Sequence, residues 1–236
     1  MGFILLEGGN EFQGQLQAVD RHALTLGGGP GTPVRILPAA AAPDGNHRRA
    51  GENGVRWFQG LGATNVRAVA VIDRTSADRA DLAAEIEAAR LVFLLGGFPG
   101  YLAETLEATR CCQALLSAFR NGAVIAGSSA GAMVVCGHYF DPGAGRLRKG
   151  LGLVQGICVL PHYERIKSAW VEKIGRLPPD HALLGIDDET GLLNDDPGGL
   201  WSVHGKGAAT LYTPAGPAVF RPGQRFHLPV SVASDS

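Results

Sequence analysis

Short, mostly apolar runs recur through residues 1–126, and amphipathic stretches separate them. Five such runs stand out: Gly2–Leu6, Val34–Ala40, Ala68–Ile72, Val92–Leu95 and Ala123–Ala126. Because none of them alternates apolar and polar residues, each is expected to form a strand covered on both faces, as in a parallel sheet. Two intervening stretches, Asp78–Arg90 and Glu104–Arg120, place apolar residues at helical spacing. The order strand, helix, strand predicts a doubly wound α/β fold with a mostly parallel sheet flanked by helices.

Local signals predict where the helices begin and end. Thr75 or Ser76 is placed to cap the helix Asp78–Arg90, and Asn121-Gly122 supplies a left-handed stop after Arg120. A third apolar face predicts another helix, ended by Pro178-Pro179; its members are Ile166, Trp170, Ile174 and Leu177. The Ala-, Pro- and Gly-rich stretch Pro38–Asn53 is predicted to be a loop.

The last quarter of the chain has a different pattern. Leu183–Leu193, Leu200–Val203 and Ala208–Tyr212 are strand-like and are separated by turn residues at 195–199 and at Gly205. These segments predict antiparallel hairpins near the C-terminus that complete the edge of the sheet. No stretch has the composition of an interdomain linker, so residues 1–236 are predicted to form a single α/β domain.

Composition excludes several classes of protein. Lys and Arg number 21 against 22 Asp and Glu, which gives a net charge of −1 and no polybasic stripe, so neither nucleic acid nor an anionic membrane surface is expected as a partner. No apolar run approaches the roughly 20 residues that span a bilayer, and Met1–Leu6 is too short for a signal peptide. The four cysteines form no CxxC pair. We therefore expect a cytoplasmic protein with reduced thiols.

The sharpest candidate for chemistry is the segment Gly127-Ser128-Ser129-Ala130-Gly131. It follows an apolar strand and opens a helical stretch, which is the context of the G-x-S-x-G nucleophile elbow. Ser129 is then the predicted nucleophile, and the Ala130 amide at the helix N-terminus is a predicted oxyanion donor. The alternative interpretation is a small-residue turn that packs a helix closely on a sheet.

A second glycine-rich segment, 96–100, follows the strand Val92–Leu95. Ligands of doubly wound sheets bind beyond the carboxyl ends of the strands, so amides here can approach a substrate. Gly97 is the candidate for the second oxyanion donor, with Gly96 as the alternative. Without the serine, an ordinary strand-to-helix turn explains the segment equally well.

A nucleophilic serine needs a base, and His162 has the best context among the seven histidines. It follows the apolar segment Ile157–Pro161 and precedes a predicted helix. His138 is close behind the elbow in sequence, but it is expected on the helix that leads away from the site. A satisfied polar residue at a strand end is the competing interpretation of His162.

Taken together, these segments resemble the peptidase E and cyanophycinase family, which are serine hydrolases on the class I glutamine amidotransferase-like, flavodoxin-like fold. The resemblance covers most of the chain and is carried by Gly8-Gly9-Asn10-Glu11, the glycine segment at 95–102, Gly127–Ala132, Leu160–Tyr163 with Arg165, and Gly185–Thr190. It implies Ser129 as nucleophile, His162 as general base and acid, and an orienting carboxylate within Gly185–Thr190. It also implies a small peptide substrate, no metal or organic cofactor, and a homodimer.

The identity of the carboxylate stays open at this stage. The family has Glu directly after Gly-Ile-Asp, whereas this chain has Asp188 there and Glu189 one residue later. Adjacent residues of a strand point to opposite faces, so only one of the two can face His162. Register favours Asp188, Glu189 is the rival, and Asp141 is a third candidate.

A second departure concerns substrate binding. Where the family carries Asp-Gln or Asn-Thr after its glycine pair, this chain has Phe98-Pro99. Gly96, Phe98 and Arg165 are the predicted substrate-binding residues, and Arg165 could pair with a substrate carboxylate. The resulting hypothesis is a serine-type peptidase for small aspartyl or β-aspartyl peptides. The alternatives are a degenerate member that binds a metabolite or partner without catalysis, and an amidotransferase-like amidase.

Overall fold

A computed structural model describes residues 1–236 except 175–176, 179–180, 197, 214–215 and 230–236. Parts of two sequence predictions lie outside what the structure describes. Pro179 of the predicted helix end and Pro197 of the predicted turn are not described, and neither is the side chain of Trp170 on the predicted apolar helix face. No helix in the described part of the chain is long and apolar enough to cross a membrane.

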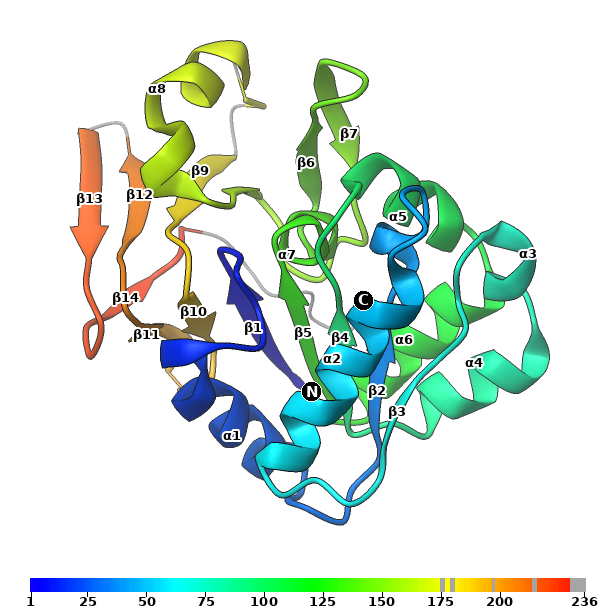
Figure 1. Ribbon diagram of the computed structural model, residues 1–236. Coiled ribbons are helices and arrows are strands. Elements are labelled where there is room, and N and C mark those ends of the chain that lie inside the picture. Colours follow the sequence, from blue (N-terminus) through cyan, green and yellow to red (C-terminus); the bar gives the residue numbers. More distant parts are fainter. Residues whose placement is uncertain (175–176, 179–180, 197, 214–215, 230–236) are drawn as a thin grey trace.

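The core of the molecule is an eight-stranded sheet with the order β14-β11-β10-β1-β5-β4-β2-β3 (Figure 1). Five of its strands are mutually parallel: β1 (Phe3–Glu7), β2 (Val34–Leu37), β3 (Val66–Ala68), β4 (Leu91–Leu94) and β5 (Val124–Ser128). Three antiparallel strands extend one edge: β10 (Thr190–Leu193), β11 (Leu200–Gly205) and β14 (Arg225–His227). The predicted fold class, a mostly parallel doubly wound sheet with antiparallel strands added near the C-terminus, is confirmed.

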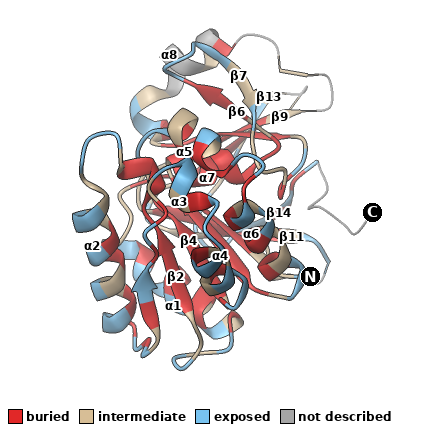
Figure 2. Cartoon of the chain, turned by 90° about the vertical axis from the view of Figure 1, so that its right-hand side faces the viewer, coloured by how far each residue is buried: buried red, intermediate tan, exposed pale blue. Residues whose placement is uncertain are grey.

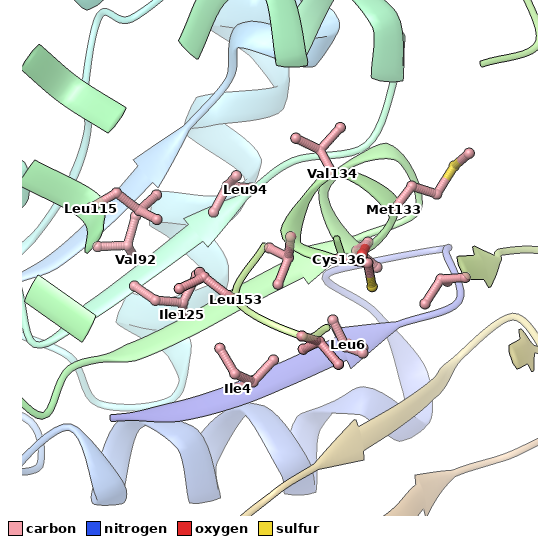
Figure 3. Close-up of a cluster of buried hydrophobic side chains, with 14 of the residues drawn as sticks. Ile4, Leu6, Val92, Leu94, Leu115, Ile125, Met133, Val134, Cys136 and Leu153 are labelled. Atoms are coloured by element: carbon pink, nitrogen blue, oxygen red, sulfur yellow. The ribbon is translucent and has the colours of Figure 1, made fainter. Parts of the chain in front are cut away.

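Helices cover both faces of this sheet, as the continuous apolar runs predict. Leu5 packs with α1 (Gln17–Leu26) and α2 (His47–Gly60) on one face, whereas its neighbours Ile4 and Leu6 pack on the other. The second face is covered by α4 (Ala80–Glu87), α5 (Pro99–Leu106), α6 (Arg110–Arg120) and α7 (Ala130–Val135). Figure 3 shows the side chains of this second face, and Figure 2 shows that the strands are buried between exposed helix surfaces.

A smaller sheet with the order β13-β12-β9-β8 stands beside the main one. It contains β8 (Ile157–Leu160), β9 (Ala182–Ile186), β12 (Ala209–Thr213) and β13 (Gly216–Phe220), and α8 (Tyr163–Ile174) connects β8 to β9. A hairpin, β6 (His138–Asp141) and β7 (Arg146–Lys149), follows α7. The predicted strand Leu183–Leu193 is in fact two strands in different sheets, and the segment between them, Asp187–Glu189, turns sharply at Glu189 (φ 51°).

The predicted loop Pro38–Asn53 is wrong. A 3₁₀ turn occupies Ala39–Ala41, and α2 begins at His47. Two glycines that suggested a loop instead allow α2 to pack closely, because a Cβ at Gly51 would lie 2.9 Å from the Cβ of Ala68, and one at Gly54 would lie 2.9 Å from the ring of Phe12. The glycines serve a helix–sheet contact and do not break the helix.

The predicted helix boundaries are also partly wrong. Asp73 caps a short helix, α3 (Arg74–Ala77), and forms a capping box with Ser76, so the predicted helix from Asp78 begins only at Ala80. The stretch Glu104–Arg120 is interrupted between Leu106 and Arg110. The stop after Arg120 is confirmed, since Gly122 has φ +89°. The four cysteines are free thiols, as predicted.

Candidate active site

The serine segment forms a tight turn between β5 and α7. Ser129 stands alone between the last strand residue and the first helix residue, with φ 49° and ψ −112°, a conformation that a non-glycine residue rarely adopts. A Cβ at Gly127 would lie 2.5 Å from the backbone of Gly131, and a Cβ at Gly131 would lie 2.2 Å from the carbonyl of Leu94 on β4. The two glycines therefore allow α7 to start directly against the sheet, with Ser129 as the single residue of the turn between them.

Three side chains from three separate segments meet at this turn. The Oγ of Ser129 lies 3.0 Å from Nε2 of His162, and Nδ1 of His162 lies 2.5 Å from Oδ1 of Asp188. His162 comes directly before α8, and Asp188 lies in the turn between β9 and β10. With a proton on Nδ1, the imidazole donates to Asp188 and leaves Nε2 free to accept the hydroxyl proton of Ser129.

The last residue of β1 and the two residues after it hold all three segments in place. The backbone carbonyls of Glu7, Gly8 and Gly9 accept hydrogen bonds from the N–H groups of Ser129, His162 and Glu189, at 3.0, 2.8 and 3.0 Å respectively. Each of these three donor residues has a positive φ, between 49° and 52°. Strained backbone of this kind persists only where the surroundings fix it. Sequence analysis noted the glycines at 8 and 9 but missed this function, because the partners lie far away along the chain.

The structure brings Asp188, and not its two rivals, to His162. The carboxylate of Glu189 lies 3.5 Å from Nζ of Lys206 and accepts from the N–H of Gln15 at 3.4 Å. Asp141 sits on β6, where it pairs with Arg148 at 3.0 Å. Glu164 also fixes the backbone of Asp188, because the Asp188 N–H donates to Oε2 of Glu164 at 2.9 Å.

The charge of Asp188 is stabilised within this group. Burial by itself raises the pKa of the Asp188 carboxyl, but hydrogen bonds from His162 and Arg165 outweigh it and hold the pKa below its ordinary value. The guanidinium of Arg165 bonds the second oxygen of Asp188, and its Nε lies 3.7 Å from Glu164. Arg165, which the sequence predicts as a substrate-binding residue, is thus already paired with two carboxylates of the chain itself.

The amides of Gly96 and Gly97, which follow β4, differ in their partners. The Gly96 N–H donates to Oε1 of Glu11 at 3.2 Å, whereas no hydrogen bond among the described residues uses the Gly97 N–H. Gly97 has φ +138°, and a Cβ there would lie 2.2 Å from the carbonyl of Ala40, so only glycine fits. Ala130 occupies the first position of α7, where the N–H has no acceptor in its own helix. Glu11 is a site residue that sequence reasoning missed, although it lies within the Gly8–Glu11 string that carried the resemblance.

An exposed aromatic side chain borders the glycine segment. Phe98 directly follows Gly97 and is 49% exposed. It lines a hollow of about 820 Å³ together with Pro43, Tyr101 and Pro142. Its charged lining residues are Arg148 and the two carboxylates that pair with it, Asp141 and Glu104, which leaves one formal negative charge in excess.

Another prediction concerns His138. The sequence predicts His138 on a helix, and this prediction is wrong. His138 lies on β6, where its Nδ1 is 2.7 Å from Nε2 of His181. Burial and the neighbouring His181 lower the pKa of His138. In the described part of the chain, no three His, Cys, Asp or Glu side chains are grouped as metal ligands.

Comparison with known proteins identifies the family. A profile of peptidase family S51 matches residues 3–198. The chain belongs to peptidase family S51. The resemblance to the peptidase E and cyanophycinase family is thereby confirmed. Two similar family members are the cyanophycinases of Trichormus variabilis and of a Nostoc species, each 28% identical over 228 residues that cover 89% of this chain and 73% of theirs.

Two solved structures show the same fold as this S51 chain. A peptidase from an acI-B1 Actinobacterium superimposes with a TM-score of 0.87 at 24% identity, covering 97% of each chain. A putative peptidase E protein from Listeria monocytogenes superimposes with a TM-score of 0.62 at 15% identity, covering 87% of this chain and 99% of its own. At these identities the likeness establishes the fold.

Proposed function

We propose that this member of family S51 is a serine-type peptidase in which Ser129, His162 and Asp188 act as a catalytic triad. The observation that carries the proposal is the continuous hydrogen-bonded chain from Ser129 Oγ through the His162 ring to Asp188 Oδ1. The three side chains follow one another in the order that the roles of nucleophile, base and orienting acid require. The left-handed conformation of Ser129 adds support, since strain of this kind is typical of a nucleophile elbow.

In the proposed reaction, Ser129 Oγ attacks the carbonyl carbon of an amide bond. His162 Nε2 takes the hydroxyl proton and then passes it to the leaving amine, while Asp188 stabilises the imidazolium through Nδ1. The resulting acyl-enzyme is cleaved by water, with His162 again acting as base. Gly97 and Ala130 are the proposed oxyanion donors: Ala130 directly follows Ser129 at the start of α7, and Gly97 follows Gly96, where an added Cβ would lie 3.3 Å from the Cβ of Ser129.

The proposed substrates are small peptides with an aspartyl or β-aspartyl bond. This part of the proposal rests on the family, two of whose members with sequence similarity to this chain are cyanophycinases. The pairing of Arg165 with Asp188 and Glu164 argues against a simple role for this arginine as the anchor of a substrate carboxylate.

The test compares the wild-type protein with Ser129→Ala on aspartyl, β-aspartyl and unrelated dipeptides, with the released amine as the readout. Loss of the nucleophile is expected to lower kcat by at least about a thousandfold. Ser117→Ala is the matched control, since Ser117 lies on α6 and bonds Glu87 at 2.7 Å, away from the site. Equal turnover by wild type and Ser129→Ala would exclude the serine mechanism.

Two further measurements on the same proteins, dipeptide binding and release of ammonia from glutamine, separate the alternative functions. A protein that binds dipeptides with and without Ser129 but hydrolyses none of them would be a degenerate binding member of the family. Release of ammonia from glutamine, with no cleavage of peptides, would identify an amidotransferase-like amidase. The Ser129–His162–Asp188 geometry favours hydrolysis over pure binding, because a binding protein has no need of a left-handed serine aimed at an imidazole.

A further inference from the structure

The loop after β1 holds one acidic side chain in a strained setting. Glu11 lies between Asn10 and Phe12, and both neighbours have positive φ values, 55° and 63°. A bulky residue such as Phe is rarely found in this conformation. The Phe12 ring is fixed by packing on Phe93, with ring centroids 4.9 Å apart, and by a contact with Phe58. The packing of Phe12 thus stabilises an unfavourable backbone conformation on both sides of Glu11, and this conformation sets the direction of the Glu11 side chain.

That side chain joins the two segments that flank the nucleophile. Oε2 of Glu11 accepts from the hydroxyl of Ser128 at 2.9 Å, and Oε1 accepts from the N–H of Gly96 at 3.2 Å. Ser128 is the fully buried last residue of β5, and Gly96 follows β4. The segments lie close together, because a Cβ on Gly96 would be 3.3 Å from the Cβ of Ser129.

We propose that Glu11 is a positioning residue that sets the geometry of the oxyanion hole. The proposal rests on the proposed function, since it assumes that Gly97 and Ala130 stabilise an oxyanion. One carboxylate bonds the residue just before each of these two donor segments: the N–H of Gly96, which precedes Gly97, and the hydroxyl of Ser128, which precedes the Ser129–Ala130 turn. With its own N–H bound by Glu11, Gly96 cannot rotate freely, and the following Gly97 amide keeps a fixed direction.

The carboxylate acts through its two acceptor oxygens. Within the described residues, no hydrogen bond joins Glu11 to Ser129 or to His162, so it does not take part in the proton transfers of the triad. A residue that replaces Glu11 must therefore do two things. It must accept a hydrogen bond from the Gly96 amide, and it must provide a hydrogen-bond partner for the Ser128 hydroxyl. An amide side chain of equal length can do so, since its oxygen accepts from Gly96 and its NH₂ donates to Ser128, whose hydroxyl can turn.

The test compares Glu11→Ala with Glu11→Gln. We expect Glu11→Ala to lower kcat by about 10- to 100-fold, somewhat less than the loss of a whole oxyanion donor, while KM changes by less than about threefold. Glu11→Gln is expected to restore kcat to within about fivefold of wild type. Glu87→Ala is the matched control, because it removes another Glu–Ser hydrogen bond, the one to Ser117, on the helices α4 and α6.

A second measurement needs no substrate. In amide hydrogen exchange, Glu11→Ala is expected to speed exchange in the segment around Gly96 at least tenfold, and Glu11→Gln is expected to leave it near the wild-type rate. Unchanged exchange and kcat in Glu11→Ala would overturn the proposal even if Ser129→Ala abolishes activity. A Glu11→Gln variant as inactive as Glu11→Ala would also overturn it, because the negative charge would then be the required property. Failure of the proposed function itself would appear separately, as turnover that does not depend on Ser129.

Discussion

Asp188 stands where the family resemblance predicts a glutamate, and the structure shows how the shorter side chain still reaches the imidazole. Its Oδ1 lies 2.5 Å from His162 Nδ1, while Arg165 bonds the other oxygen and Glu164 accepts from the backbone N–H. These contacts fix both the backbone and the carboxylate. The position of the turn between β9 and β10, and not the length of the side chain, provides the reach.

Asp188→Asn is expected to lower kcat by roughly 10⁴-fold, the effect seen when a triad aspartate is replaced by its amide and the imidazole takes the wrong tautomer. Glu189→Gln, one residue away, is expected to change kcat by less than about threefold, because Glu189 contacts Lys206 and Gln15 instead. The measurement is kcat and KM for both variants on the best substrate of the wild-type protein. A larger loss in Glu189→Gln than in Asp188→Asn would show that the acid has been assigned to the wrong residue.

At this scale the sequence could limit the candidates but could not select among them. Strand alternation indicated that only one of Asp188 and Glu189 faces His162. The actual backbone is not a strand there, because Glu189 has φ 51° and donates to the Gly9 carbonyl. That contact joins residues 180 positions apart, and no local pattern predicts it.

At the scale of elements, the end of β1 organises the site more than any element that carries a proposed catalytic side chain. Three successive carbonyls, those of Glu7, Gly8 and Gly9, each hold a different segment. Gly9 has φ +134°, and a Cβ there would lie 2.1 Å from Cε1 and 2.5 Å from Nδ1 of His162. The backbone of this loop therefore packs directly against the imidazole.

Gly9→Ala is expected to lower kcat/KM by at least about a hundredfold, because the added methyl group displaces His162 from Asp188 and Ser129. Gly62→Ala is the matched control: Gly62 also has a left-handed φ, +102°, but a Cβ there meets nothing within 4 Å. Both variants carry the cost of an unfavourable φ, so both are expected to lower the melting temperature. Only Gly9→Ala should lose activity. Similar activity losses in the two variants would indicate that backbone strain, and not contact with His162, is responsible.

Elements were predictable where local pattern and tertiary packing agree. The strands β1, β4 and β5 follow from continuous apolar runs, since both faces of the parallel sheet are covered. The helix α2 was missed because its glycines at 51 and 54 resemble loop residues until the packed neighbours, Ala68 and Phe12, are known. The division of Leu183–Leu193 between two sheets was missed for a similar reason: an apolar run does not record which partner strand each half pairs with.

At the scale of the whole molecule, two buried acids link the sheet to the helices beneath the site. Glu7 on β1 and Asp20 on α1 are both fully buried and adjacent, and Nε1 of Trp57 on α2 donates to Oδ2 of Asp20 at 2.8 Å. Burial raises the pKa of Glu7 well above its ordinary value, and the neighbouring Asp20 adds to the effect. Burial likewise raises the pKa of Asp20 to about 7, and Glu11 contributes in the same direction.

These shifts predict how stability depends on pH. Below pH 3.8, the ordinary pKa of aspartate, Asp20 is protonated in both the folded and the unfolded chain. Between pH 3.8 and about 7 only the folded chain retains the proton, so the contribution of Asp20 to the free energy of unfolding falls as the pH rises. Above about pH 7 the group is ionised in both states, and the destabilisation is complete.

Asp20→Asn removes this titration while keeping an acceptor for Trp57 and a donor for Glu7. Relative to wild type, the variant is therefore expected to gain free energy of unfolding steadily from pH 4 to pH 7 and to be the more stable protein at pH 8. Urea unfolding at pH 4, 5.5, 7 and 8 measures this difference, with the exposed Asp44→Asn as the control whose difference from wild type should stay nearly constant. A difference between Asp20→Asn and wild type that does not change with pH would mean that the folded protein does not hold a proton on Asp20.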